Sequence, residues 1–343
     1  MKGHVVGVDG GTTKTIALVA DYQGRILGAS RARGSNWTGA DVEIPMAVVA
    51  AAVRDALSQA GLGGDDIELG MFALAGADWP EDHDRRRAVL ERAHVARHTV
   101  VKNDAFAGMR SGSSRPYGLV IAAGTGTNTA IIAPDGREWA FGYYATHGGA
   151  SDMAQEAIEA VLRAEDGRGP QTELTGLVLD QLNYHNVESM LRGLVAREVG
   201  HARRLSLCPL VFEAAYRGDE VATELVVKQG HALAEYATAL IRRFGIAGQE
   251  FDVVLSGSLL KGRGPLLVDT ITQAIHRVAP LARIVPARFE PAVGAVLLAY
   301  DALGLIADEV IYNNLAVTCP EPAFYSTVDG GDPSLDAWDR HKR

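Results

Sequence analysis

The chain has 343 residues, enough for two domains, and its composition of 47% hydrophobic and 22% charged residues is that of a globular protein. A net charge of −9 argues against a nucleic-acid-binding surface, which would cluster Lys and Arg. Cys208 and Cys319 are the only cysteines, and their wide separation gives no support to a disulfide framework or a zinc site.

The same composition indicates where the protein works. Two isolated cysteines fit a reducing cytoplasm. We find no apolar run of about 18 residues and no signal-peptide pattern, so we expect a cytoplasmic protein that neither spans a membrane nor is exported.

The first part of the chain predicts a mixed α/β domain. Residues 4–8 and 14–20 read as strands, and a turn at 22–24 leads to a third strand in "RILGASRA". This β-meander carries a glycine loop, "DGGTTK", at its first corner. Helical periodicity follows over 40–60 and stops at Gly61, and "IELGMFALAG" reads as a buried strand.

A second meander begins at residue 117. The segment 117–142 repeats the order of strand, glycine-threonine loop, strand, turn and third strand. Gly24 and Gly136, each followed by Arg, lie about 112 positions apart, a spacing that suits a duplicated domain. The two loops do not align residue for residue, so a coincidence of two hairpins stays open.

The remainder is mainly helical. Helical patterns cover most of 151–245, "FDVVLSG" reads as a buried strand, and further helices are expected at 265–279 and 291–304. From about 319 the chain is rich in Pro, Gly and Asp, which is typical of a loosely attached tail. We therefore predict an N-terminal domain at 1–115, a C-terminal domain with a helical insertion at 116–305, and a tail at 306–343.

The two glycine loops indicate phosphate binding. Glycine between two strands lets backbone N–H groups converge on an anion, and neighbouring Thr and Lys side chains add donors. The P-loop pattern is absent, and both loops lead into strands, unlike the helix of a dinucleotide fingerprint. A tight turn alone would explain one such loop, but not two loops together with a strand that ends in Ser-Gly-Ser.

Six segments in order resemble the actin-like ATPase superfamily of sugar kinases, actins and chaperone ATPases. "VGVDGGTTKT" and "VIAAGTGTN" are similar to its phosphate motifs and "VVLSGSLLKG" to its adenosine motif, while "GSNW", "ALAGAD" and "VKNDAFAG" resemble further family segments. Within the superfamily, the chain is most similar to the N-acetylglucosamine kinase group related to BadF/BadG-type ATPases. The resemblance implies two actin-like (ribonuclease H-like) α/β domains with a nucleotide cleft between them.

The resemblance assigns roles residue by residue. It implies ATP and Mg²⁺, with Asp9 near the metal, Asp104 as the base that takes the proton of a sugar hydroxyl, and Asn36 and Trp37 at the acceptor. Without it, Asp104 would be an N-cap for the helix that follows, and Asn36 would be turn chemistry. The implied nucleotide contacts are Gly10, Gly11, Thr12, Thr13, Lys14, Gly124, Thr125, Gly126, Gly257 and Ser258.

The chain departs from the sugar-kinase pattern after the second meander. Gly142, Tyr143 and Tyr144 keep the position of one sugar-side segment, but Gly149 and Ala150 stand where Asp and Glu are expected. Asp152 either substitutes for the missing Asp or caps the helix that begins nearby. His147 is another candidate for a replacement contact.

The function expected from this resemblance is an ATP-dependent kinase that phosphorylates an amino sugar, N-acetylglucosamine or glucosamine, on its 6-hydroxyl, in a protein that forms a homodimer. The alternative is a BadF/BadG-type ATPase that couples hydrolysis to conformational change without a sugar acceptor. Related dehydratase activators hold an iron–sulfur cluster with cysteines, and this chain has no Cys before Cys208.

Overall fold

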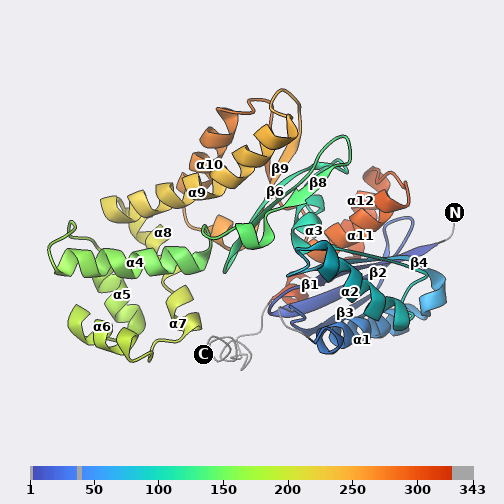
Figure 1. Ribbon diagram of the computed structural model, residues 1–343, viewed down its shortest axis with the longest axis horizontal. Coiled ribbons are helices and arrows are strands. Elements are labelled where there is room, and N and C mark those ends of the chain that lie inside the picture. The colour runs from blue at the N-terminus through green and yellow to red at the C-terminus, as the bar shows by residue number, and fades with distance from the viewer. Residues whose placement is uncertain (1–2, 37–40, 327–343) are drawn as a thin grey trace.

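The computed structural model describes residues 3–36 and 41–326 and contains two five-stranded sheets (Figure 1). The first sheet has the order β3-β2-β1-β4-β5. Its strands β1 to β3 form the predicted antiparallel meander, and β4 and β5 run parallel to β1. The bounds are β1 His4–Gly10, β2 Lys14–Asp21, β3 Ile26–Arg33, β4 Ile67–Leu74 and β5 His98–Asn103.

The second sheet repeats this topology with the order β8-β7-β6-β9-β10. Its meander is again antiparallel, and β9 and β10 are parallel to β6. Both predicted meanders are therefore confirmed, and the sheets match strand for strand. The bounds are β6 Gly118–Ala123, β7 Thr127–Ile132, β8 Glu138–Ala140, β9 Asp252–Ser256 and β10 Arg283–Pro286.

The first sheet is covered by helices on both faces. Residues 5 to 8 of β1 are fully buried, as expected for a strand packed on both sides. On one face, Val6 and Val8 contact helix α1, Glu43–Ala60, which ends at Gly61 in the left-handed conformation. Helix α2, Pro80–Arg92, follows β4 and lies beside α1.

The other face of the first sheet meets the second sheet through helices α3, Asp104–Arg110, and α11, Pro291–Ala302. One hydrophobic core joins Val5 of β1 and Val296 of α11 to Phe106 of α3 and Val120 of β6. The two short helices thus fix the loops of one sheet relative to those of the other.

A helical region projects from the second sheet on the side away from the first (Figure 1). It forms around a separate hydrophobic core, which confirms the helical pattern predicted for 151–245. Its helices are α4 Ala150–Glu165, α5 Leu174–Leu182, α6 Val187–Val195, α7 His201–Leu205, α8 Cys208–Arg217, α9 Glu220–Phe244 and α10 Leu266–His276.

The C-terminal elements pack on the first sheet. Helix α11 lies against β1, although the sequence assigned residues 291–304 to the second domain. Part of the predicted tail is helical, because α12, Glu309–Thr318, buries Ile311 and Leu315 in the same core and is followed by the short α13, Pro322–Tyr325. The domain boundaries stay a prediction. Among the residues described, no helix is long and apolar enough to cross a membrane.

Candidate active site

Three carboxylates gather at one edge of the first sheet. The parallel strands β1, β4 and β5 end side by side, with Gly10 paired to Leu74 and Leu74 to Asn103. Asp9 precedes the end of β1, Asp78 follows β4, and Asp104 follows β5. In open α/β sheets, ligands bind outside the carboxyl ends of such strands. This edge is therefore the candidate active site.

The turn from β5 into α3 places Asp104. Asn103 is the N-cap of α3, and its Oδ1 atom accepts a hydrogen bond from the Ala105 N–H at 2.9 Å. The interpretation of Asp104 as the N-cap is therefore wrong. Asp104 is instead the first helical residue, and its side chain is not needed to cap the helix.

The electrostatics of this edge favour protonated carboxyls or a cation. Burial raises the pKa of Asp9 to about 7, with further increases from the charges of Asp104 and Glu290 and a decrease from Lys14. Burial and the charge of Asp78 raise the pKa of Asp104 to about 6, although the Ala105 N–H lowers it. Titration near neutral pH is what a general base requires.

The first glycine loop is a tight hairpin that is braced by the segment after β3. Gly11 N–H donates to the Lys14 carbonyl at 2.8 Å, and the Asn36 N–H donates to the Gly11 carbonyl at 3.2 Å. The Asn36 side-chain amide also donates to the Thr12 hydroxyl at 3.1 Å. The structure thus brings the predicted acceptor residue Asn36 to the predicted phosphate loop. Trp37 lies outside the described residues.

Lys14 contacts the C-terminal segment. Its ammonium donates to the Tyr325 carbonyl and lies 3.9 Å from the Glu290 carboxylate. The family resemblance implies that this ammonium faces the phosphates of a nucleotide, and that role stays a prediction. No local pattern could reveal a contact between residues 311 positions apart.

The second glycine loop, Gly124–Gly126, lies between the start of α4 and the end of β9. The N–H groups of Ala150 and Ser151 donate to the Gly124 and Thr125 carbonyls at 2.8 and 3.1 Å. On the other side, Gly257 has a φ of +108°, and an added Cβ would lie 2.2 Å from the Ala123 carbonyl oxygen. Only glycine fits this approach. The predicted adenosine segment is thereby brought to the base of the loop.

Gly149 has no space for the Asp that the sugar-kinase pattern expects there. An added Cβ would lie 2.5 Å from the Thr125 carbonyl oxygen and 2.6 Å from the Gly126 Cα atom. Asp152 acts as the cap of α4, because its Oδ2 atom accepts from both the Gly148 and Gly149 N–H groups at 3.0 Å. Whether Asp152 also contacts a sugar stays a prediction.

A chain of hydrogen bonds crosses from the first sheet to the second. The Asn103 amide donates to Asp78 at 2.7 Å, the Asn128 amide donates to Asn103 at 3.0 Å, and the Gly142 N–H donates to Asn128 at 3.0 Å. Sequence reasoning did not assign roles to these three residues, although each lies in a segment that resembles the family. Asp78 lies in "ALAGAD", Asn103 in "VKNDAFAG" and Asn128 in "VIAAGTGTN". The chain therefore sets the Asp104 turn beside the second meander.

The remaining predicted residues lie around this chain. Tyr143 and Tyr144 follow Gly142 in a 3₁₀ turn and are 53% and 59% exposed. His147 instead faces α9, with its Nδ1 atom 3.2 Å from the Tyr236 hydroxyl. It is thus held by a partner in the helical region.

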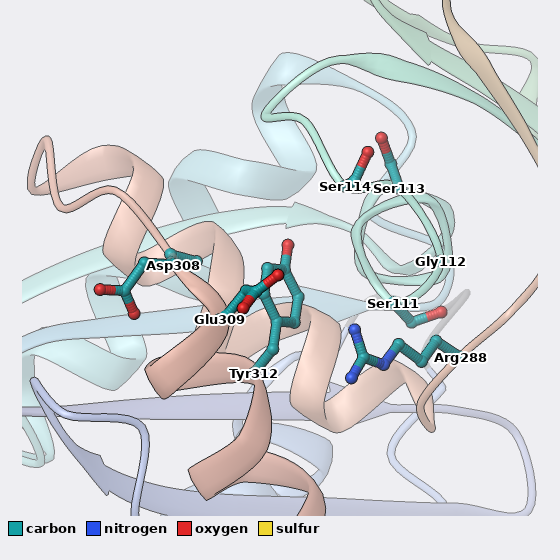
Figure 2. A pocket seen from close by; sticks show the side chains of 9 residues that line it. Ser111, Gly112, Ser113, Ser114, Arg288, Asp308, Glu309 and Tyr312 are labelled. Atoms are coloured by element: carbon teal, nitrogen blue, oxygen red, sulfur yellow. The ribbon is translucent and has the colours of Figure 1, made fainter.

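A cavity of about 490 Å³ is lined by none of the residues that the sequence predicted for the site (Figure 2). Figure 2 shows Arg288 on one side of it and Asp308 and Glu309 on the other, with Ser113 and Ser114 above. Its wall includes Tyr312, whose hydroxyl accepts from the buried Arg110 guanidinium at 2.7 Å. Arg110 also pairs with Asp301 of α11 at 2.7 Å, so this region holds α3, α11 and α12 together.

The chain belongs to the BadF/BadG/BcrA/BcrD ATPase family, whose model matches residues 6–299. It is 25% identical to the N-acetyl-D-glucosamine kinase of Dictyostelium discoideum over 87% of this chain and 98% of that protein. It is 28% identical to glucosamine kinase GspK of Vibrio cholerae over 69% and 80% of the two chains.

The fold agrees with this assignment. A Chromobacterium violaceum structure described as an N-acetylglucosamine kinase superposes with a TM-score of 0.65 at 24% identity, covering 87% of this chain and 99% of that one. The two mixed sheets are therefore the two-domain actin-like fold expected from the sequence.

The close packing at Gly149 predicts that the family Asp cannot be restored. Gly149→Asp should displace the Thr125–Gly126 loop, because the Cβ atom meets backbone on two sides. We expect a lower melting temperature, and affinity for an ATP analogue reduced by roughly tenfold or more, both compared with the parent. Gly248→Asp is the matched control, since nothing lies within 4 Å of a Cβ added there. A Gly149→Asp protein with parental melting and nucleotide affinity would contradict the geometry.

Proposed function

We propose that the protein is an ATP-dependent sugar kinase that phosphorylates an amino sugar, N-acetylglucosamine or glucosamine, on its 6-hydroxyl. The observation that carries the proposal is the chain of hydrogen bonds that sets Asp104 beside the strand after the second glycine loop. A carboxylate with a raised pKa therefore belongs to the turn that is hydrogen-bonded to the strand after the second glycine loop, next to the proposed phosphate site. The named sugar kinases to which the chain is similar support the same reaction.

The two glycine loops would hold the nucleotide from opposite sheets. The loops at residues 10–13 and 124–126 would face the phosphates with backbone N–H groups other than those of Gly11 and Gly124, which close the two turns. Gly257 and Ser258 would lie against the adenosine. Each loop supplies half of a phosphate cradle, so both sheets must contribute. Phosphoryl transfer depends mainly on such positioning and on charge neutralisation.

Asp104 would act as the general base. As the 6-hydroxyl oxygen forms its bond to the γ-phosphorus of ATP, the bond from that phosphorus to the bridging oxygen breaks and ADP leaves. The hydroxyl proton passes to the Asp104 carboxylate. Asn36, Gly142, Tyr143, Tyr144 and Asp152 remain the proposed acceptor contacts, together with Trp37.

Asp9 fits a magnesium site of the kind that kinases use. Mg²⁺ is commonly held by one or two carboxylates together with water and substrate phosphates. The nearby charges of Asp104 and Glu290, which raise the Asp9 pKa, would be offset by a cation. When bound, the ion would neutralise phosphate charge, and Asp9 would hold it directly or through water.

The proposal includes a cytoplasmic homodimer. The cytoplasmic location is supported by two unpaired cysteines, of which Cys208 is buried in the helical core. The homodimer is supported by the family resemblance alone.

A screen of acceptors tests the proposed reaction. With ATP and Mg²⁺, we expect glucosamine or N-acetylglucosamine to yield a phosphosugar, identified by mass, faster than neutral hexoses or N-acetylmuramic acid. Faster phosphorylation of a neutral hexose would preserve the mechanism and overturn the amino-sugar assignment. ATP turnover without any phosphosugar would contradict the kinase proposal and favour the ATPase alternative.

Gly126→Val tests the two-loop cradle. A Cβ atom added at Gly126 meets nothing within 4 Å in the protein, so we expect the fold to be kept, but the side chain would occupy the space through which backbone approaches phosphate. We expect affinity for an ATP analogue, measured by calorimetry, to fall at least tenfold. Gly248→Val, equally unobstructed, should bind as the parent does. Parental affinity in folded Gly126→Val would refute the cradle.

The raised pKa of Asp104 predicts the pH dependence of catalysis. The base acts when deprotonated, so at saturating Mg²⁺ kcat/KM should fall as the pH drops through about 6, not through the ordinary aspartate range. Asp104→Asn should lower kcat by roughly a hundredfold or more and preserve nucleotide binding. It should also remove the fall in kcat/KM near pH 6. Asp84→Asn, on the exposed face of α2, is the control. Near-parental kcat in Asp104→Asn would exclude the proposed role.

A further inference from the structure

A pocket lined by aromatic side chains adjoins the Asp104 turn. Its volume is about 240 Å³, and loops of both sheets form it. We call it the aromatic pocket and define it by Trp79, Trp139, Phe141, Tyr143 and Tyr144. Trp79 precedes α2 beside the first sheet, whereas Trp139 lies in β8 and the other three residues directly follow that strand. A ligand in this pocket would therefore touch both halves of the protein.

Three of these rings, those of Trp79, Tyr143 and Tyr144, are exposed and form one cluster. Trp79 is 44% exposed, and its ring is inclined by only 17° to that of Tyr143, with 6.2 Å between centroids. Tyr144 lies 6.0 Å from Trp79 and 6.1 Å from Trp139. Grouped exposed aromatics of this kind mark binding sites, because their apolar faces gain from contact with a ligand.

The inner end of the pocket is tied to the proposed base. Asp78 and Asn103 line the pocket, and their side chains are hydrogen-bonded to each other at 2.7 Å. Asn103 directly precedes Asp104, which does not itself line the pocket. The pocket is therefore adjacent to the place where the acceptor hydroxyl would react, and separate from the carboxylate that would take the proton.

The charge and size of the pocket narrow the ligand class. Its lining includes the acidic residues Asp78 and Glu138 and the basic residue His83, and Glu138 is paired with Lys102. An anionic group would be repelled by Asp78, whereas hydroxyls could donate to it. The volume is below that of pockets for drug-sized ligands, so it holds one ring and not a nucleotide. A neutral pyranose has the apolar face and the hydroxyl-bearing edge that match.

We propose that the aromatic pocket is a second acceptor subsite that binds a pyranose ring linked to the ring phosphorylated beside Asp104. The preferred acceptor class is then a disaccharide of amino sugars. This inference rests on the proposed kinase function. It also accounts for acceptor recognition in a chain where Gly149 admits no side chain and the Asp152 carboxylate caps α4.

The test compares kcat/KM for N-acetylglucosamine and glucosamine with kcat/KM for their β-1,4-linked disaccharides. Trp79→Ala should lower the ratio of disaccharide to monosaccharide kcat/KM about tenfold, the scale of lost aromatic contacts. Trp79→Phe retains an aromatic face and should lower the ratio less than threefold. Tyr216→Ala removes another exposed ring, which lies on α8 under the Arg263 guanidinium and does not line the pocket, and should preserve the ratio.

Calorimetric titration of the disaccharides without nucleotide separates this inference from the proposed function. If the parent phosphorylates no sugar but Trp79→Ala weakens disaccharide binding, the subsite stands and the kinase proposal fails. If the parent phosphorylates monosaccharides while the ratio is unchanged in Trp79→Ala, the subsite is overturned and the kinase proposal stands. Failure of the parent to bind or phosphorylate either disaccharide would also overturn the subsite.

Discussion

The burial of carboxylates at one sheet edge is the constraint on which the rest of the site depends. Burial raises the pKa of Asp9 and of Asp104, and neighbouring negative charges raise both further, from Asp104 and Glu290 on Asp9 and from Asp78 on Asp104. At neutral pH, ionised groups whose pKa values are raised by burial destabilise the folded protein, and the cost is relieved as the pH falls. A cation or an accepted proton relieves it equally. The edge is thus suited to a reaction that supplies a metal cation with the substrate and transfers a proton to a carboxylate.

The repeated topology explains why the site lies between two halves. Each sheet opens with a meander whose first corner is a glycine loop, and each places its parallel strands beside the first strand of that meander. Helices α3 and α11 pack between the sheets and fix their relative position through one shared core. The Asn103–Asn128 hydrogen bond then joins the halves at the point where Asp104 leaves the sheet.

Much of the fold could be predicted because its signals are local. Strand alternation, the turns at Gly24 and Gly136 and the stop at Gly61 depend on neighbouring residues, and the structure contains the corresponding elements. Helix α12 was not predicted, because its stability comes from burying Ile311 and Leu315 in a core formed by residues far away in the sequence. Its residues were assigned to the C-terminal tail, 306–343, because no local pattern indicates that contact.

The site shows the same division between local and distant causes. The glycine loops and Asp104 were recognised from short segments. The N-cap of α3, however, is Asn103 and not Asp104. The contact of Lys14 with Tyr325 depends on backbone far along the chain. The lack of space at Gly149 depends on how closely two loops approach each other. The aromatic pocket likewise combines Trp79 with rings about 60 positions later, a juxtaposition produced by tertiary packing.

A crystal structure of the complex with a non-hydrolysable ATP analogue and an amino sugar tests the central claim most directly. The account predicts that the phosphates lie between the loops at residues 10–13 and 124–126, with the sugar 6-hydroxyl within hydrogen-bonding distance of Asp104 and in line with the γ-phosphorus. A nucleotide bound to one loop only, or a sugar hydroxyl oriented away from Asp104 in the closed complex, would contradict it.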